Sequence, residues 1–121
     1  DNEALLAAMK EQLGDAVTKV AVSTRLTDAP SAVTTEGPVS LEMERLMSQM
    51  PDGMGEVKSQ RVLELNAKHP VFQVLKDAQS AGDAEKVKLY TEILYDQALI
   101  VEGMPIADPV AYANAVTKLM A

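Results

Sequence analysis

The sequence predicts an α+β domain in which a small three-stranded sheet packs against helices. Two observations carry this prediction. Apolar residues recur at helical spacing in five stretches, and three short runs between them alternate or are rich in β-branched residues. The 121 residues, 47% of them apolar and 24% charged, suit one globular domain spanning residues 1–121. The predicted order is helix, strand, strand, helix, strand and then three helices.

The N-terminal third is predicted to form a helix followed by two strands. Glu3 to Leu13 carries apolar residues at helical spacing, and Gly14 follows it as a stop signal. Val17 to Ser23 alternates as a strand does, and Ala32 to Thr35 is a second β-rich run. Turn residues ending in Pro30 separate the two runs. We therefore expect two short strands of one sheet.

A short amphipathic helix is predicted from Val39 to Met50, between two breaks that contain Gly and Pro. Its apolar face is formed by Val39, Met43, Leu46, Met47 and Met50. One interpretation is that this face packs on the core of its own domain. The other is that the helix is loosely attached and offers flexible thioethers to varied apolar partners. The second interpretation predicts binding of unfolded polypeptide with low specificity.

The C-terminal half is predicted to contain one strand and three helices. Arg61 to Asn66 alternates as a third strand. Pro70 occupies a first helical position, and the helix that it starts extends to Gly82. A long helix lies within Asp83 to Glu102 and a last one within Asp108 to Met120, each with an aspartate at its N-cap.

The last two helices carry more apolar surface than a single domain face can cover. The long helix has two apolar stripes, formed by Val87, Tyr90, Leu94, Ala98 and Val101 and by Leu89, Ile93 and Ile100. A surface helix normally has one stripe about 100° wide, so two stripes imply burial on two sides. Between Val110 and Ala121 the only charged side chain is Lys118. We therefore expect the pair to pack on its own domain and on another copy of the chain.

The charge balance excludes several classes of partner. The formal net charge is −7 and the isoelectric point is near 4.6, while the eleven Lys and Arg residues are scattered singly. Nucleic acids and anionic membranes need clustered positive charge, so neither is an expected partner. The acidic start is unlike a secretory signal, and no stretch approaches the roughly 18 apolar residues of a membrane span. The chain begins at Asp1 in mid-pattern, which suggests a piece of a longer protein.

The sequence offers little catalytic or metal-binding chemistry. No cysteine is present and His69 is the only histidine, so the usual zinc ligand sets cannot form. We interpret His69 as a polar residue at the start of a helix. Residues 53–59 faintly resemble a phosphate-binding loop, but Val57 stands before Lys58 where the motif requires Gly. We therefore predict a connector there, and no catalytic residue, bound cofactor or metal site in this chain.

Four ordered blocks of the sequence carry a family resemblance. They are Val20 to Val33, Leu41 to Met47, Arg61 to Val71 and Leu94 to Met120. In order and spacing they resemble the 90-kDa heat-shock chaperone family, and specifically the C-terminal domain of its bacterial HtpG-type members. The resemblance runs almost from end to end of the chain and is far more specific than any single motif.

The resemblance implies the homodimerisation domain of an ATP-dependent molecular chaperone. ATP and Mg would be held by an N-terminal domain outside this chain. The last two helices of each subunit would form an intermolecular four-helix bundle with their mates. The resemblance assigns to this dimer interface Ile93, Leu94, Gln97, Ala98, Val101, Tyr112, Val116, Leu119 and Met120. It assigns client binding to Val39, Met43, Leu46, Met47 and Met50.

The partners implied by the resemblance are a second copy of the chain and unfolded or partly folded client proteins. The chain ends at Ala121 without the acidic tail that recruits tetratricopeptide-repeat co-chaperones. This end favours a bacterial cytoplasmic protein, with an organelle as the alternative. A competing hypothesis is a generic helical dimerisation or adaptor module without client binding, in which the Met-rich helix belongs to the core. A small enzyme is a third and more distant alternative.

Overall fold

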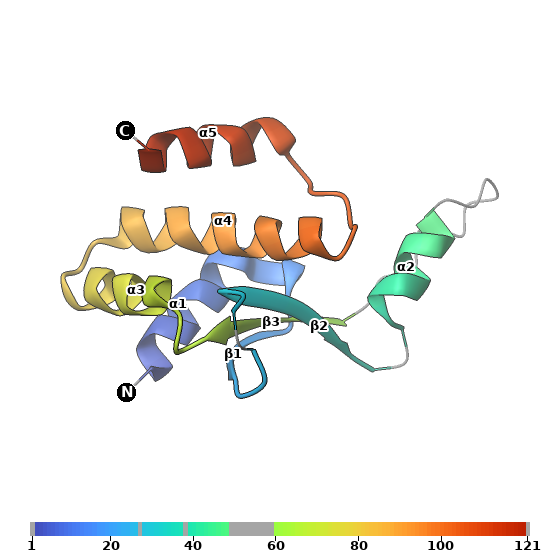
Figure 1. Ribbon diagram of the computed structural model, residues 1–121, viewed down its shortest axis with the longest axis horizontal. Coiled ribbons are helices and arrows are strands. Elements are labelled where there is room, and N and C mark those ends of the chain that lie inside the picture. The colour runs from blue at the N-terminus through green and yellow to red at the C-terminus, as the bar shows by residue number, and fades with distance from the viewer. Residues whose placement is uncertain (1, 27, 38, 49–59, 121) are drawn as a thin grey trace.

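A computed structural model describes residues 2–26, 28–37, 39–48 and 60–120, with the backbone alone for residues 47 and 48. The elements are α1 (Glu3–Leu13), η1 (Gly14–Ala16, a short 3₁₀ helix), β1 (Lys19–Ser23), β2 (Ser31–Glu36), α2 (Leu41–Ser48), β3 (Gln60–Asn66), α3 (Pro70–Ser80), α4 (Ala84–Val101) and α5 (Pro109–Met120). In Figure 1, α4 lies between α5 and the rest of the domain, and α2 extends away from the sheet. The α+β class and the predicted order of helices and strands are confirmed in these ranges.

β3 is the central strand of the three-stranded sheet, whose order is β1-β3-β2. β1 runs parallel to β3, and β2 runs antiparallel to it. In this register Val20 of β1 and Val33 of β2 both lie opposite Leu63 of β3. The three side chains are buried together in the core. The connection from β1 to its parallel neighbour contains β2 and α2, so α2 projects from a crossover.

The core lies between one side of the sheet and helices α1, α3 and α4. Met9 of α1, Leu63 of β3 and Leu75 of α3 are among its fully buried side chains. A buried hydrogen bond joins the sheet to α4, because Ser31 Oγ donates to the carbonyl oxygen of Leu94 at 3.0 Å. These contacts fix α4, on which the last helix then packs.

The helix starts predicted from capping residues are confirmed. Asp83 and Asp108 accept backbone N–H hydrogen bonds at the starts of α4 and α5, at 3.2 Å and 3.0 Å respectively. His69 Nδ1 accepts the N–H of Val71 at 3.1 Å. The single histidine therefore caps α3, as interpreted from the sequence.

The start of the Met-rich helix differs from the prediction. The helix was expected from Val39 but begins at Leu41. The hydroxyl of Ser40 accepts the N–H of Met43 at 3.1 Å and so acts as the N-cap. Met50 and the predicted connector that follows it lie outside the described residues.

Candidate interaction surfaces

The exposed large apolar side chains belong to two parts of the chain. Among the side chains that the structure describes, they are Met43 and Leu46 on α2, and Ile100, Val101, Val110, Leu119 and Met120 on α4 and α5. We call the first group the α2 face and the second the C-terminal face. Apolar residues scattered singly over a surface are ordinary, whereas groups of them mark interaction sites. These two faces are therefore the candidate functional sites.

α2 extends away from the sheet (Figure 1), and two of its apolar side chains are exposed. Met43 is 41% exposed and Leu46 is 51% exposed. On the other side of the helix, Leu41 packs on the core and Glu44, three residues later, contacts the sheet. An ordinary surface helix has the opposite arrangement, with its apolar stripe inward and its charges outward. The α2 face is therefore arranged as a contact surface.

The interpretation that the Met-rich stripe packs on its own core does not hold for Met43 and Leu46, which are exposed. Val39, just before the helix, is half-buried. Met47 and Met50 do not belong to the described side chains. Of the predicted client-binding residues whose side chains the structure describes, Met43 and Leu46 are exposed and Val39 is half-buried.

Arg61 of β3 connects α2 to α4 through two guanidinium nitrogens. Nη2 lies 2.6 Å from Glu44 Oε2 in α2, and Nη1 donates to the hydroxyl oxygen of Tyr95 in α4 at 2.9 Å. The Tyr95 hydroxyl donates in turn to the Ala16 carbonyl oxygen at 3.4 Å. We call this group the Arg61 junction.

The Arg61 junction is a largely buried charged cluster. The side chains of Arg61 and Glu44 are only 16% and 15% exposed. Burial alone lowers the pKa of Arg61, but its interactions with the Tyr95 hydroxyl and the Glu44 carboxylate outweigh that effect and raise the pKa. The guanidinium is therefore charged at neutral pH.

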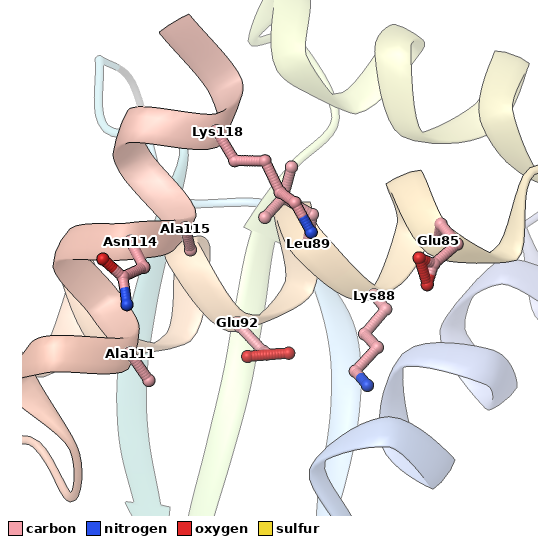
Figure 2. A pocket seen from close by; sticks show the side chains of 8 residues that line it. All are labelled: Glu85, Lys88, Leu89, Glu92, Ala111, Asn114, Ala115 and Lys118. Carbon is pink, nitrogen blue, oxygen red and sulfur yellow. The ribbon is translucent and has the colours of Figure 1, made fainter. Parts of the chain in front are cut away.

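α5 runs back along α4 and packs against it (Figure 1). Ala115 is the residue of α5 that is buried. Figure 2 shows the groove between the two helices, with Ala115 at the contact. This groove has a volume of about 330 Å³ and is lined by Glu85, Lys88, Leu89, Glu92, Ala111, Asn114, Ala115 and Lys118. Charges of both signs surround it, so it does not resemble a site for an apolar partner. Three larger apolar residues of α5, Val110, Leu119 and Met120, are exposed in the single chain.

A second cavity beside the same helix pair is more apolar. It has a volume of about 340 Å³ and is lined by Pro30, His69, Val71, Tyr90, Ile93, Leu94, Gln97 and Leu119. Four of the predicted dimer-interface residues therefore meet at one place, although they come from two helices. We call this the α4–α5 cavity.

The nine predicted interface residues differ in exposure. Ile93, Leu94 and Ala98 are buried within the single chain, and the last two belong to its core. The residues at the surface are Gln97, Val101, Leu119 and Met120, with Tyr112 and Val116 half-buried. Leu94 and Ala98 pack in the chain's own core, and their assignment to the dimer interface stays a prediction.

Ile100 and Val110 are exposed residues of the C-terminal face that the sequence reasoning did not assign to the interface. Both lie near the turn between α4 and α5. A signal was present, because Ile100 belongs to the second apolar stripe of the long helix and Val110 begins the low-charge segment. Spacing alone cannot say which stripe faces the chain's own core.

The candidate functional sites of this chain are its two apolar faces, the α2 face and the C-terminal face. In residues 2–26, 28–37, 39–48 and 60–120, no three His, Cys, Asp or Glu side chains are grouped as metal ligands. Nor does any helix within those ranges combine the length and the apolar character needed to cross a bilayer.

Comparison with known proteins assigns the chain to a family. The sequence model of the family described as Hsp90 protein matches residues 1–121. The chaperone protein HtpG of Clostridium perfringens is 48% identical over 120 residues, which are 99% of this chain and 19% of that protein. HtpG of Bacillus subtilis is 46% identical over 116 residues, which are 96% of this chain and 18% of that protein. The chain thus spans about a fifth of the length of these relatives. It belongs to the Hsp90 protein family.

Proposed function

We propose that this chain is the homodimerisation domain of an ATP-dependent chaperone and that its α2 face contacts unfolded or partly folded client proteins. The observation that carries the proposal is the division of the exposed large apolar side chains between the C-terminal face and the α2 face. Membership of the Hsp90 family, and relatives named chaperone proteins, support the chaperone role. With two separate apolar faces, the chain can stay bound to a second copy of itself through one face and bind different client proteins through the other.

The C-terminal face suits a second copy of the chain. Its residues come from two adjacent helices, so a two-fold axis beside them brings four helices into one bundle. Leu119 lines the α4–α5 cavity, whose 340 Å³ leaves room for an apolar side chain of the mate. The pairing covers Val101 and Met120, which are exposed in the single chain. Each Å² of apolar surface removed from water contributes roughly 25 cal/mol.

The proposed role of the dimer is to tether two longer chains. We place ATP and Mg on an N-terminal domain of each subunit of the longer chaperone. Joining two chains at one end raises the effective concentration of their other ends for each other. Contact between those ends then becomes an intramolecular step, so this domain contributes architecture to the ATP-driven cycle.

The α2 face suits partners whose shape varies. Met43 carries a flexible thioether on a projecting helix, and such side chains adapt to irregular apolar surfaces. Unfolded polypeptides present apolar side chains in many arrangements, which an adaptable surface binds with low specificity. Because the relatives compared come from bacteria, we propose the bacterial cytoplasm as the location.

Binding of an unfolded polypeptide tests the client surface and separates this proposal from a generic dimerisation module. Fluorescently labelled, reduced and carboxymethylated lactalbumin is titrated with the chain and with a Met43→Ser, Leu46→Ser double variant. We expect the variant to bind about tenfold more weakly, a loss of about 1.4 kcal/mol. Gln12→Ser, an exposed change on α1, is the control and should bind as the unchanged chain does. Equal binding by the double variant contradicts the α2 assignment, and no binding by the unchanged chain favours the generic module.

A further inference from the structure

α2 needs contacts outside itself to hold a fixed orientation. It has eight residues, and helices shorter than about 12 residues are marginal in isolation. It also extends away from the body of the domain (Figure 1). Its direction relative to the sheet therefore depends on the side chains that join it to the body.

Two of those side chains lie on one side of α2. Leu41 packs on the core, and Glu44 reaches Arg61 at 2.6 Å. Residues three apart lie on the same side of a helix, so these two contacts share one face. With that face held inward, Met43 and Leu46 are left on the outward side, where both are exposed.

The other end of the connection lies in the body of the domain. Arg61 belongs to the central strand β3, and its second contact, Tyr95, is a buried residue of α4. The two contacts use different nitrogens, Nη2 for Glu44 and Nη1 for Tyr95. A planar guanidinium with both nitrogens engaged has a fixed orientation, which a lysine ammonium cannot reproduce because it is a point charge.

The burial of the Arg61 junction distinguishes it from the other arginine–glutamate pair of the sheet. Arg25 pairs at 2.8 Å with Glu64, which lies on β3 as Arg61 does, but the Arg25 side chain is 59% exposed. Exposed pairs hold their partners weakly because water competes for both charges. A largely buried pair resists opening, because opening leaves a charge without compensation away from water.

We propose that Arg61 is a positioning residue for the α2 face: by bridging Glu44 of α2 to Tyr95 of α4, it holds α2 in the orientation that presents Met43 and Leu46 outward. Only the expected effect on client binding rests on the proposed function. The orientation of α2 itself is a property of the chain and can be measured without a client.

The test measures the mobility of α2 directly. The chain has no cysteine, so a nitroxide attached through Glu42→Cys, at an exposed position of α2, is the only label on each chain. Its electron paramagnetic resonance line shape is recorded for the otherwise unchanged chain and with Arg61→Met, Arg61→Lys, Glu44→Gln or Tyr95→Phe. Arg25→Met is the matched control, because it breaks an exposed Arg–Glu pair whose glutamate, Glu64, lies on the same strand as Arg61.

Arg61→Met and Glu44→Gln should both give a clearly more mobile spectrum, and Arg61→Lys should resemble Arg61→Met more than the unchanged chain. Tyr95→Phe removes one of the two contacts and should have a smaller effect in the same direction. Arg25→Met should leave the spectrum unchanged. If Arg61→Met does not fold, Glu44→Gln decides the matter, because it alters α2 alone. A spectrum that stays the same in Glu44→Gln, or that changes equally in Arg25→Met, overturns the proposal.

Client binding supplies the second readout, with unlabelled chains and the same carboxymethylated lactalbumin. A mobile α2 must be ordered during binding, so Arg61→Met should bind about threefold to tenfold more weakly while Met43 and Leu46 are unchanged. Unchanged affinity in a variant whose spectrum has become mobile overturns the link between orientation and binding. If the unchanged chain binds no lactalbumin, the proposed function fails, and the spectra alone still decide whether Arg61 positions α2.

Discussion

The Glu44 carboxylate and the Arg61 guanidinium meet 2.6 Å apart, with both side chains largely buried. The two side chains belong to elements that differ in their attachment to the domain. Arg61 is held in the central strand β3, whereas Glu44 lies on the projecting helix α2. Removing Glu44 leaves a buried cation with one contact fewer, while removing Arg61 leaves a carboxylate on the projecting helix.

This asymmetry predicts unequal losses of stability. Glu44→Ala should lower the free energy of unfolding by about 1–3 kcal/mol, because a buried charged donor loses its acceptor. Arg61→Met should cost less, and urea denaturation followed by circular dichroism measures both. Glu64→Ala breaks the pair with the exposed Arg25 and should cost less than about 1 kcal/mol. Equal losses for Glu44→Ala and Glu64→Ala would contradict the assignment of a buried junction.

Asp96 should make the fold less stable at neutral pH than an uncharged residue would. Burial raises the pKa of this carboxyl above its ordinary value of 3.8, and the negative charges of Glu92 and Asp108 raise it further. Because the folded chain binds this proton more tightly than the unfolded chain, the stabilising contribution is complete below pH 3.8 and is lost as the pH rises through the raised value.

Asp96→Asn should therefore be more stable than the unchanged chain at pH 7, by about 0.5 kcal/mol or less, since water screens this partly exposed group. Urea denaturation at pH 7 and again below pH 4 measures the difference. The advantage of the asparagine should shrink in acid. If the stability advantage of Asp96→Asn instead grew as the pH fell, folding would lower the pKa of Asp96 and not raise it.

Ser31 should contribute to stability by joining β2 to α4. Its buried hydroxyl donates to the Leu94 carbonyl oxygen at 3.0 Å, and alanine cannot replace that donor. We expect Ser31→Ala to lower the free energy of unfolding by about 1 kcal/mol. Ser80→Ala, at an exposed position of α3, should stay within about 0.5 kcal/mol of the unchanged chain.

Met9 and Met43 provide a matched comparison of a core methionine with a surface one. Met9 is fully buried, so Met9→Ala should cost about 2–5 kcal/mol through the cavity that it leaves. Met43 is exposed on α2, so Met43→Ala should change the free energy of unfolding by about 0.5 kcal/mol or less. A loss at Met43 as large as that at Met9 would mean that the α2 face packs within the domain.

Local signals were sufficient for much of the fold. The aspartates before α4 and α5, and the His69–Pro70 start of α3, were recognisable because capping depends on residues close in sequence. The pairing of β1 and β2 with β3 was not recognisable, because it joins residues 24 to 43 positions apart and no short pattern encodes it.

The candidate sites were predicted less completely for the same reason. Helical spacing placed Leu94 and Ile100 on different stripes of α4, but only the packed structure shows that Leu94 faces the core and Ile100 faces outward. The Arg61 junction was missed altogether. A signal existed. Arg61, Leu63 and Leu65 are two residues apart, so all three lie on the same face of β3, and that face is the core side. A charge on that side needs a partner.

Sedimentation equilibrium of the chain at micromolar concentration tests the central claim most directly. A dimer has twice the 13.0 kDa of the single chain, and we expect that mass for the unchanged chain and for Gln12→Glu, which adds a charge to an exposed position of α1. Leu119→Glu adds the same charge to the C-terminal face and should shift the mass toward 13.0 kDa while circular dichroism shows a folded chain. A folded, unchanged chain that sediments as a monomer at micromolar concentration would contradict the proposed dimerisation domain.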